Sequence, residues 1–285
     1  MLENEKTWCF FMENHSKKEE HEEIPVQLTA RLMAHYRAME RHQKEPLLVD
    51  PLARRLAGNM NEFIEKHQWM AARGDYPIVR SHFIEHEIMP SWCHEHRDKK
   101  GQIVLLGAGF DTRAYRFTDF SETMLQLFEV DIPSILNYKE EFLEGETPLL
   151  PIVRVGCDLA SESLPDRLIT VGYANDHLTL WIFEGLLYYL ERPTATRLLQ
   201  DASSMSIAGS KLFVDTCVPG YAHAEFGVLK HFKWGLEFDE MVPFFSHVGW
   251  DVRVFHPEEY EPGKDRDTGQ RGMAFIVGSK KGRRT

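Results

Sequence analysis

The sequence predicts an α/β fold in which a mostly parallel, seven-stranded sheet ends in an antiparallel hairpin and is preceded by an N-terminal helical region. Three observations predict it. Apolar residues recur at helical spacing up to about residue 100. Short runs rich in β-branched and aromatic residues then alternate with helical stretches. Between the last two runs lies only a polar, turn-rich stretch.

Composition limits the class of protein and its partners. Of 285 residues, 43% are apolar and 12% aromatic, which is enough for a large core. The formal charge of −11 argues against a nucleic-acid partner, which would require a positive surface. Four widely spaced cysteines form no CxxC pair, and no apolar run matches a signal peptide or a membrane span. We therefore expect a cytoplasmic protein with no membrane partner.

The N-terminal part divides into an arm and a helical cap region. Residues 1–24 form the arm, which is mostly charged from residue 13 onward. Residues 25–100 form the cap region, in which apolar spacing, prolines and a closing glycine indicate successive helices. Helices are expected at residues 26–41, 61–68 and 79–89, and a short helix, punctuated by Pro46 and Pro51, is expected to end near Gly58.

The remaining residues, 101–285, are expected to form the core. Seven strands are predicted, at residues 103–106, 125–129, 152–155, 178–182, 212–215, 250–255 and 273–278. Helical stretches between the first five strands indicate a parallel sheet covered on both faces. The closing hairpin differs from a symmetric dinucleotide-binding fold and is typical of the Rossmann-like class I methyltransferases.

A glycine turn follows the first strand in the segment IVLLGAGFDTRAYRF. Gly107 and Gly109 would let the backbone approach a ligand without a Cβ in the way. Asp131, at the end of the second strand, follows at about the distance at which an acid receives ribose hydroxyls. Both a nicotinamide dinucleotide and S-adenosylmethionine contain that ribose. Thr112 stands where the dinucleotide fingerprint has its third glycine, which favours S-adenosylmethionine.

Two more acids follow the next two strands. Asp158 would accept from an adenine amino group with Leu159 as an apolar wall, or alternatively it caps the following helix. Glu184 would hold an amino group of the cofactor, or alternatively it pairs with a nearby arginine.

Six motifs in a fixed order resemble the leucine carboxyl methyltransferase family, especially its bacterial small-molecule O-methyltransferase branch. They are TARLMAHYRAMER, VDPLAR, GAGFDTRAYR, FEVD, CDL and FEGLLYYL. The resemblance extends over about residues 26 to 280. It implies a class I methyltransferase fold with a helical cap, S-adenosylmethionine as methyl donor, and a small-molecule carboxylate or hydroxyl acceptor, such as a polyketide-like compound.

The resemblance also implies a cofactor-binding set. Gly107 matches the family's glycine turn and Asp131 its ribose acid. Asp158 and Leu159 match its adenine pair, and Glu184 its acid after the fourth strand.

Two basic residues complete this set. Arg80 resembles the family arginine that meets the cofactor carboxylate, and a guanidinium suits that role because it makes two parallel hydrogen bonds. The alternative is a surface arginine paired with Glu85 or Glu87. Arg37 resembles a basic residue of the family's first helix. An insertion at about residues 219–245 is implied to line the acceptor pocket.

The catalytic residue depends on the acceptor. A carboxylate is already ionised at neutral pH and needs no general base, so proximity alone would suffice. A hydroxyl acceptor would benefit from a base, for which the candidates are Tyr188, Tyr189, His223 and His231. The alternative is that the tyrosines are core residues and the histidines exposed polar ones.

Rival interpretations remain open. A metal site at residues 93–96 is disfavoured because the spacing is too local to close a tetrahedral site, so no metal is expected. A protein C-terminal carboxylate is the alternative acceptor. The alternative functions are an NAD(P)-dependent oxidoreductase and a catalytically silent module that binds S-adenosylmethionine. The oligomeric state is left open.

Overall fold

The computed structural model describes residues 26–66, 74–222, 227–266, 268 and 272–282. The predicted arm at residues 1–24 therefore lies outside the described residues, as does His223. Within the described part of the chain, no helix is both long enough and apolar enough to cross a membrane.

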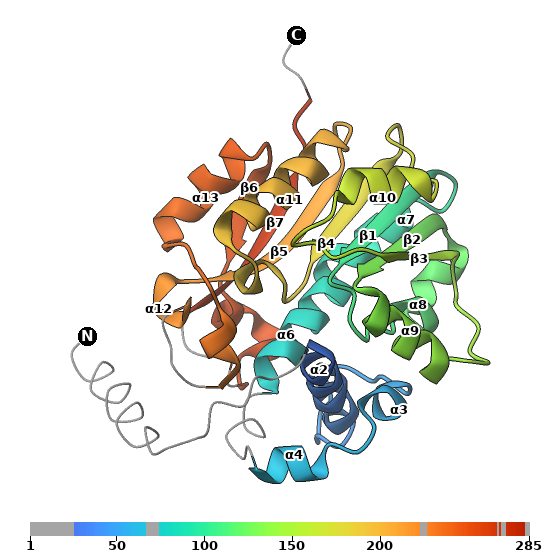
Figure 1. Ribbon diagram of the computed structural model, residues 1–285, viewed down its shortest axis with the longest axis vertical. Coiled ribbons are helices and arrows are strands. Elements are labelled where there is room, and N and C mark those ends of the chain that lie inside the picture. Colours follow the sequence, from blue (N-terminus) through green and yellow to red (C-terminus); the bar gives the residue numbers. More distant parts are fainter. Residues whose placement is uncertain (1–25, 67–73, 223–226, 267, 269–271, 283–285) are drawn as a thin grey trace.

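All seven predicted strands are present and form one sheet (Figure 1). They are β1 (Lys100–Leu106), β2 (Met124–Asp131), β3 (Ile152–Gly156), β4 (Leu178–Phe183), β5 (Lys211–Cys217), β6 (Asp251–Phe255) and β7 (Met273–Ser279). The strand order is β3-β2-β1-β4-β5-β7-β6. The first five strands are parallel, whereas β7 runs antiparallel to both β5 and β6. The predicted closing hairpin therefore contributes β7 to the sheet interior and β6 to its edge.

Each central strand buries both of its faces, as parallel sheets do. Val104 and Leu106 point into one apolar layer, whereas Ile103 and Leu105 point into the other. The first layer is covered by α10 (Leu164–Thr170), α11 (Arg192–Ser204) and α13 (Phe238–His247). The second is covered by α6 (Asp75–Phe83), η1 (Ile84–Ile88), α7 (Met89–Glu95), α8 (Arg113–Arg116) and η2 (Thr118–Glu122). Helices thus enclose the sheet on both sides.

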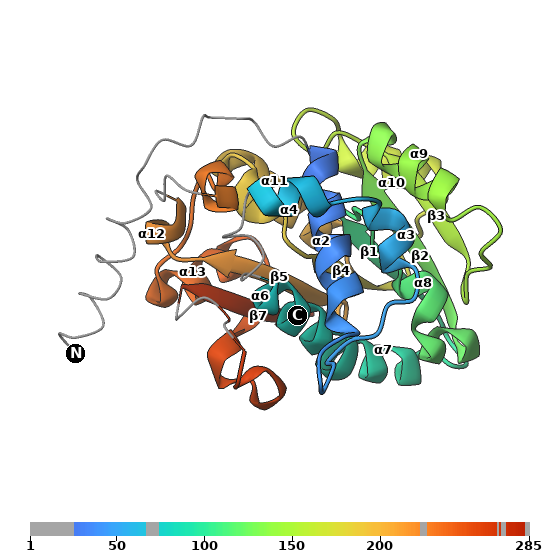
Figure 2. The same ribbon diagram turned by 90° about the horizontal axis from the view of Figure 1, so that it is seen from below.

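The first helices lie at one end of the sheet (Figure 2), and their apolar side chains form a third cluster. They are α2 (Val26–Glu40), α3 (Ala53–Ala57) and α4 (Asn61–Lys66), and they pack with α9 (Pro133–Phe142). Leu32 and Leu56 are fully buried there with Ile135. By contrast, α6 packs directly on the sheet. The proposed division into arm, cap and core stays a prediction.

Several short elements differ from the expected pattern. The predicted helix at residues 79–89 is α6 followed by the π-helix η1 and the start of α7. The predicted insertion at about residues 219–245 contains α12 (Pro219–Ala222), η4 (Gly227–His231) and most of α13. Three further short elements are the 3-10 helices η3 (Leu187–Tyr189), η5 (Pro257–Glu259) and η6 (Glu261–Gly263).

Candidate functional site

The carboxyl ends of β1 and β4 define the site. These two strands are neighbours, yet the chain proceeds from β1 to β2 and β3 on one side and from β4 to β5 on the other. Open α/β sheets bind ligands at such a switch point, outside the carboxyl ends of the strands. Every strand-end residue predicted from the sequence lies at this edge, because parallel strands end on the same side.

The turn after β1 has the backbone that glycine permits. Gly107 and Gly109 have φ values of 64° and 47°, in the left-handed region that favours glycine. A Cβ on Gly107 would come within 3.1 Å of Leu186 Cδ1, and one on Gly109 would lie 3.8 Å from Ala30 Cβ. The turn therefore lies between the end of β4 and helix α2.

Asp131 is bonded to that turn. Its Oδ2 accepts a hydrogen bond from Gly109 N at 2.7 Å, and its Oδ1 accepts one from Ile132 N at 2.7 Å. Burial raises the pKa of Asp131, and these two backbone amides oppose the rise only in part. Each carboxylate oxygen retains acceptor capacity for a further donor.

Asp158 and Leu159 follow β3. The carboxylate of Asp158 accepts from Ala160 N at 2.9 Å and from Ser161 Oγ at 2.7 Å, while Leu159 is buried. The alternative that Asp158 caps the next helix is wrong. A capping residue directly precedes the first helical turn. For α10 this residue is Ser163, whose hydroxyl accepts a hydrogen bond from Asp166 N.

Glu184 follows β4 and has three donors. Its Oε1 accepts from Arg80 Nε at 3.1 Å and from Ser81 Oγ at 2.8 Å, and its Oε2 accepts from Arg113 Nη1 at 2.7 Å. Burial would raise the pKa of Glu184, but Arg113 and Arg80 hold that pKa well below its ordinary range. The carboxylate is therefore ionised, and the arginine pairing foreseen as an alternative is present.

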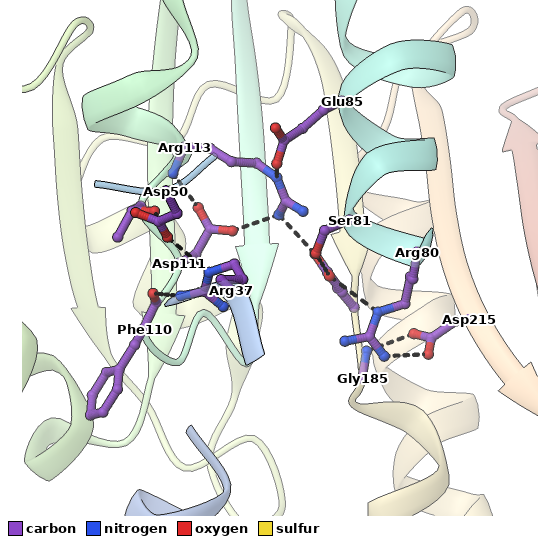
Figure 3. A network of polar contacts seen from close by, with 12 residues as sticks. Arg37, Asp50, Arg80, Ser81, Glu85, Phe110, Asp111, Arg113, Gly185 and Asp215 are labelled. Atoms are coloured by element: carbon purple, nitrogen blue, oxygen red, sulfur yellow. Dashed lines mark hydrogen bonds and ion pairs between the residues drawn. The ribbon is translucent and has the colours of Figure 1, made fainter. Parts of the chain in front are cut away.

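Arg80 is buried, with 6% of its surface exposed. Besides Glu184, it donates from Nη1 to Asp215 Oδ2 at 2.7 Å (Figure 3) and to Tyr188 Oη at 3.2 Å. The alternative of a surface arginine paired with Glu85 or Glu87 is wrong, because Arg80 lies on the face of α6 that packs on the sheet. Among the described residues, its Nη2 has no hydrogen-bond partner.

Sequence reasoning missed the charged residues around this pair. Arg113 donates from Nε to Glu85 at 2.9 Å and from Nη1 to Asp111 as well as Glu184. Arg116 also bonds to Glu85. The segment DTRAYR, with an acid and two arginines directly after the glycine turn, was the available signal. The result is a buried network joining the glycine turn to α6 and η1 (Figure 3).

Arg37 lies on the opposite side of the turn. It donates from Nε to Asp50 Oδ2 at 2.9 Å and from Nη2 to the carbonyl oxygen of Phe110 at 2.6 Å. Thr112 Oγ1 donates to the same Asp50 oxygen at 2.6 Å. The position where a dinucleotide fold has its third glycine therefore holds a side chain that fixes the turn to the first helices.

The candidate bases differ in their surroundings. Tyr188 is buried, stacks on Phe232 with ring centroids 4.0 Å apart, and donates to Asp215. Burial raises the pKa of both Tyr188 and Tyr189 above the ordinary value, so both phenols are neutral. His231 is half-buried at the end of η4. Neither tyrosine is suited to accept a proton at neutral pH.

The segment at residues 93–96 has side chains in different environments. Cys93 and His96 are buried, whereas the two residues between them are exposed. His96 Nδ1 lies 2.8 Å from the carbonyl oxygen of Trp92.

Comparison of the sequence with known proteins identifies relatives. Residues 30–203 match the leucine carboxyl methyltransferase family. A Frankia alni protein, provisionally named an S-adenosyl-L-methionine-dependent methyltransferase, is 29% identical over an alignment of 254 residues; the match covers 81% of this chain and 84% of that protein. A Parafrankia protein with the same provisional name is 37% identical over 142 residues. That match covers 49% of this chain and spans 44% of the relative's length.

Solved structures share the fold. A DUF574 family protein from Streptomyces avermitilis has a TM-score of 0.57 at 14% identity, over 90% of this chain and 100% of that one. A provisionally named methyltransferase from Thermobifida fusca has a TM-score of 0.53 at 17% identity, over 88% and 94% of the two chains. At such low identity the likeness concerns the fold alone.

Proposed function

The chain belongs to the leucine carboxyl methyltransferase family, and we propose that it is an S-adenosylmethionine-dependent O-methyltransferase acting on a carboxylate or hydroxyl of a small molecule. One observation carries the proposal. The glycine turn, Asp131 and the Arg80–Glu184 pair lie together at the carboxyl edge of the sheet, beside its switch point. The provisional names of the Frankia and Parafrankia relatives support the same cofactor.

The residues at this edge fit the cofactor's chemical groups. Gly107 and Gly109 carry no Cβ, so the nucleoside can approach the backbone. Asp131 would accept from the ribose hydroxyls, and Asp158 with Leu159 would meet the adenine. Arg80 Nη2, which has no hydrogen-bond partner in the described part of the chain, would meet the cofactor carboxylate, and Glu184 its amino group. The bound cofactor supplies an electrophilic methyl group on a sulfonium.

The protein's own contribution is binding and orientation. A carboxylate acceptor is ionised at neutral pH, so no side chain has to remove a proton. Holding acceptor oxygen, methyl and sulfur in line contributes up to about 7–11 kcal/mol to lowering the barrier. The neutral phenols of Tyr188 and Tyr189 agree with a mechanism that uses no general base.

Substitution of Asp131 tests the proposal. Asp131→Ala should lower the affinity for S-adenosylmethionine at least tenfold in calorimetry, because the ribose loses its acceptor; the variant should still fold, with a lower melting temperature because Gly109 N and Ile132 N lose their acceptor as well. Methyl-labelled cofactor incubated with a cell extract should yield a labelled small molecule from the wild-type chain. Unchanged affinity in Asp131→Ala would contradict the cofactor assignment.

Three outcomes would favour the rival functions. If the labelled methyl group were found on the C-terminal carboxylate of a protein, the acceptor would be a protein and not a small molecule. Binding of nicotinamide cofactors without S-adenosylmethionine binding would indicate an oxidoreductase. Cofactor binding without transfer to any acceptor would indicate a silent binding module. A cytoplasmic location stays a prediction.

A further inference from the structure

Asp215 is a buried acid at the carboxyl end of β5 that the sequence analysis did not single out. Its side chain is fully buried, and four donors surround it. Oδ1 accepts from Gly185 N at 2.6 Å. Oδ2 accepts from Arg80 Nη1 at 2.7 Å, from Tyr76 Oη at 2.9 Å and from Tyr188 Oη at 2.9 Å. The carboxylate is therefore held from both of its oxygens (Figure 3).

Two of these donors belong to the proposed cofactor site. Gly185 directly follows Glu184 and has a φ of 65°, so the bond from its amide fixes the peptide that carries Glu184. Arg80 is bonded to Glu184 through Nε and to Asp215 through Nη1. A planar guanidinium held at two nitrogens by two acids has its third nitrogen fixed in direction.

The tyrosines complete the enclosure of Arg80. The ring of Tyr76 lies 5.5 Å from the guanidinium carbon of Arg80, within the range of a cation–π contact. Its hydroxyl donates to Asp215, as does that of Tyr188. Both phenols therefore hold Asp215 in the rotamer that bonds to Arg80.

We propose that Asp215, held by Tyr76 and Tyr188, is a positioning residue that aims Arg80 at the carboxylate of the cofactor's amino-acid part. The proposal rests on the proposed function. It assigns Asp215 no contact with the reacting atoms. The expected consequence is selective: loss of Asp215 should lower the affinity for ligands that carry the carboxylate and leave the affinity for ligands that lack it unchanged.

Two ligands and four variants test the selectivity. S-adenosylhomocysteine carries the amino-acid part, whereas 5′-methylthioadenosine has the same nucleoside and sulfur without it. Calorimetry should show at least tenfold weaker binding of S-adenosylhomocysteine to Asp215→Asn and at least threefold weaker binding to Tyr76→Phe and Tyr188→Phe. Binding of 5′-methylthioadenosine should stay within twofold of wild type in all three variants.

Tyr173→Phe is the matched control. Tyr173 is also buried, and its hydroxyl bonds to Thr179 Oγ1 and the carbonyl oxygen of Met205 at the opposite end of β4. The Tyr173→Phe variant loses a buried tyrosine hydroxyl, as Tyr76→Phe and Tyr188→Phe do, and should bind both ligands as the wild type does. If Asp215→Asn does not fold, the tyrosine variants decide the question.

The negative outcomes are distinct. If the Asp215, Tyr76 and Tyr188 variants bound both ligands equally more weakly, Asp215 would have only a structural role, and the proposal would be overturned. Unchanged binding of both ligands would overturn it as well. A wild-type chain that bound neither ligand would refute the proposed function itself, and the positioning role with it.

Discussion

Ionisable side chains of one type behave differently in this protein because their neighbours differ. Burial raises the pKa of Asp131, whose nearest donors are two backbone amides. Asp50 is also buried, but Arg37 and Arg116 outweigh the burial and lower its pKa. Burial and the neighbouring His86 lower the pKa of His82 to about 4. The protonation state of each side chain therefore depends on its burial and its neighbours in the fold, which the residue type alone does not indicate.

His82 yields a prediction for stability against pH. Its pKa in the folded chain lies below the ordinary value of about 6.5, so the unfolded chain binds the proton more readily. The contribution of neutral His82 is therefore present above pH 6.5 and is lost as the pH falls toward 4. Allowing for solvent screening of a half-buried ring, we expect a loss of about 1 kcal/mol.

Urea unfolding of wild type and His82→Gln at pH 7 and pH 5 measures this loss. The wild type should lose about 1 kcal/mol more than the variant between the two pH values. Two other groups are close: His86 stacks on the ring at 3.9 Å, and Tyr260 Oη lies 2.9 Å from Nδ1. An equal loss in both proteins would assign the pH dependence to other groups.

At the scale of elements, the residues after α2 hold the glycine turn. Asp50 accepts from Leu52 N and Ala53 N at the start of α3, and also from Arg37 and Thr112. One acid thereby joins a helix start, the first long helix and the turn after β1. The segments VDPLAR and GAGFDTRAYR therefore meet in the fold through the bond between Asp50 and Thr112.

Asp50→Ala should destabilise the fold strongly. It removes the partner of Arg37, whose side chain is only 12% exposed, and the acceptor of Thr112. Breaking a buried pair costs about 3–5 kcal/mol. Arg55→Ala is the control, because the Arg55–Glu146 pair is exposed and should contribute less than about 1 kcal/mol. Free energies of unfolding from urea titration compare the two variants. A loss of similar size in both would contradict the proposed role of Asp50.

At the scale of the whole molecule, helix α6, which belongs to the predicted cap region, shares an apolar core with the sheet. Val79 and Phe83 from α6 lie in the same apolar cluster as Ile103 of β1 and Phe275 of β7. Arg113 and Arg80 add buried ion pairs across the same boundary. The predicted boundary at residue 100 therefore crosses a packed interface.

We expect the described helices and the sheet to unfold together. Calorimetry should show a single transition, and far-ultraviolet circular dichroism and tryptophan fluorescence should give the same midpoint. Trp92 reports on α7 and Trp181 on β4, and both are fully buried. Two separated transitions, or midpoints that differ between the probes, would show that the first hundred residues form an independent unit.

The sequence by itself determined the seven strands, the glycine turn and the acids at the strand ends. These follow from local patterns, and parallel strands bring their carboxyl ends to one edge without further information. Only the tertiary structure decided that Arg80 bonds to Glu184 and Asp215, that Arg37 bonds to Phe110, and that β7 lies between β5 and β6. The physical reason is distance along the chain. Arg80 and Asp215 are 135 residues apart, and the choice among several acids depends on packing that no local spacing encodes.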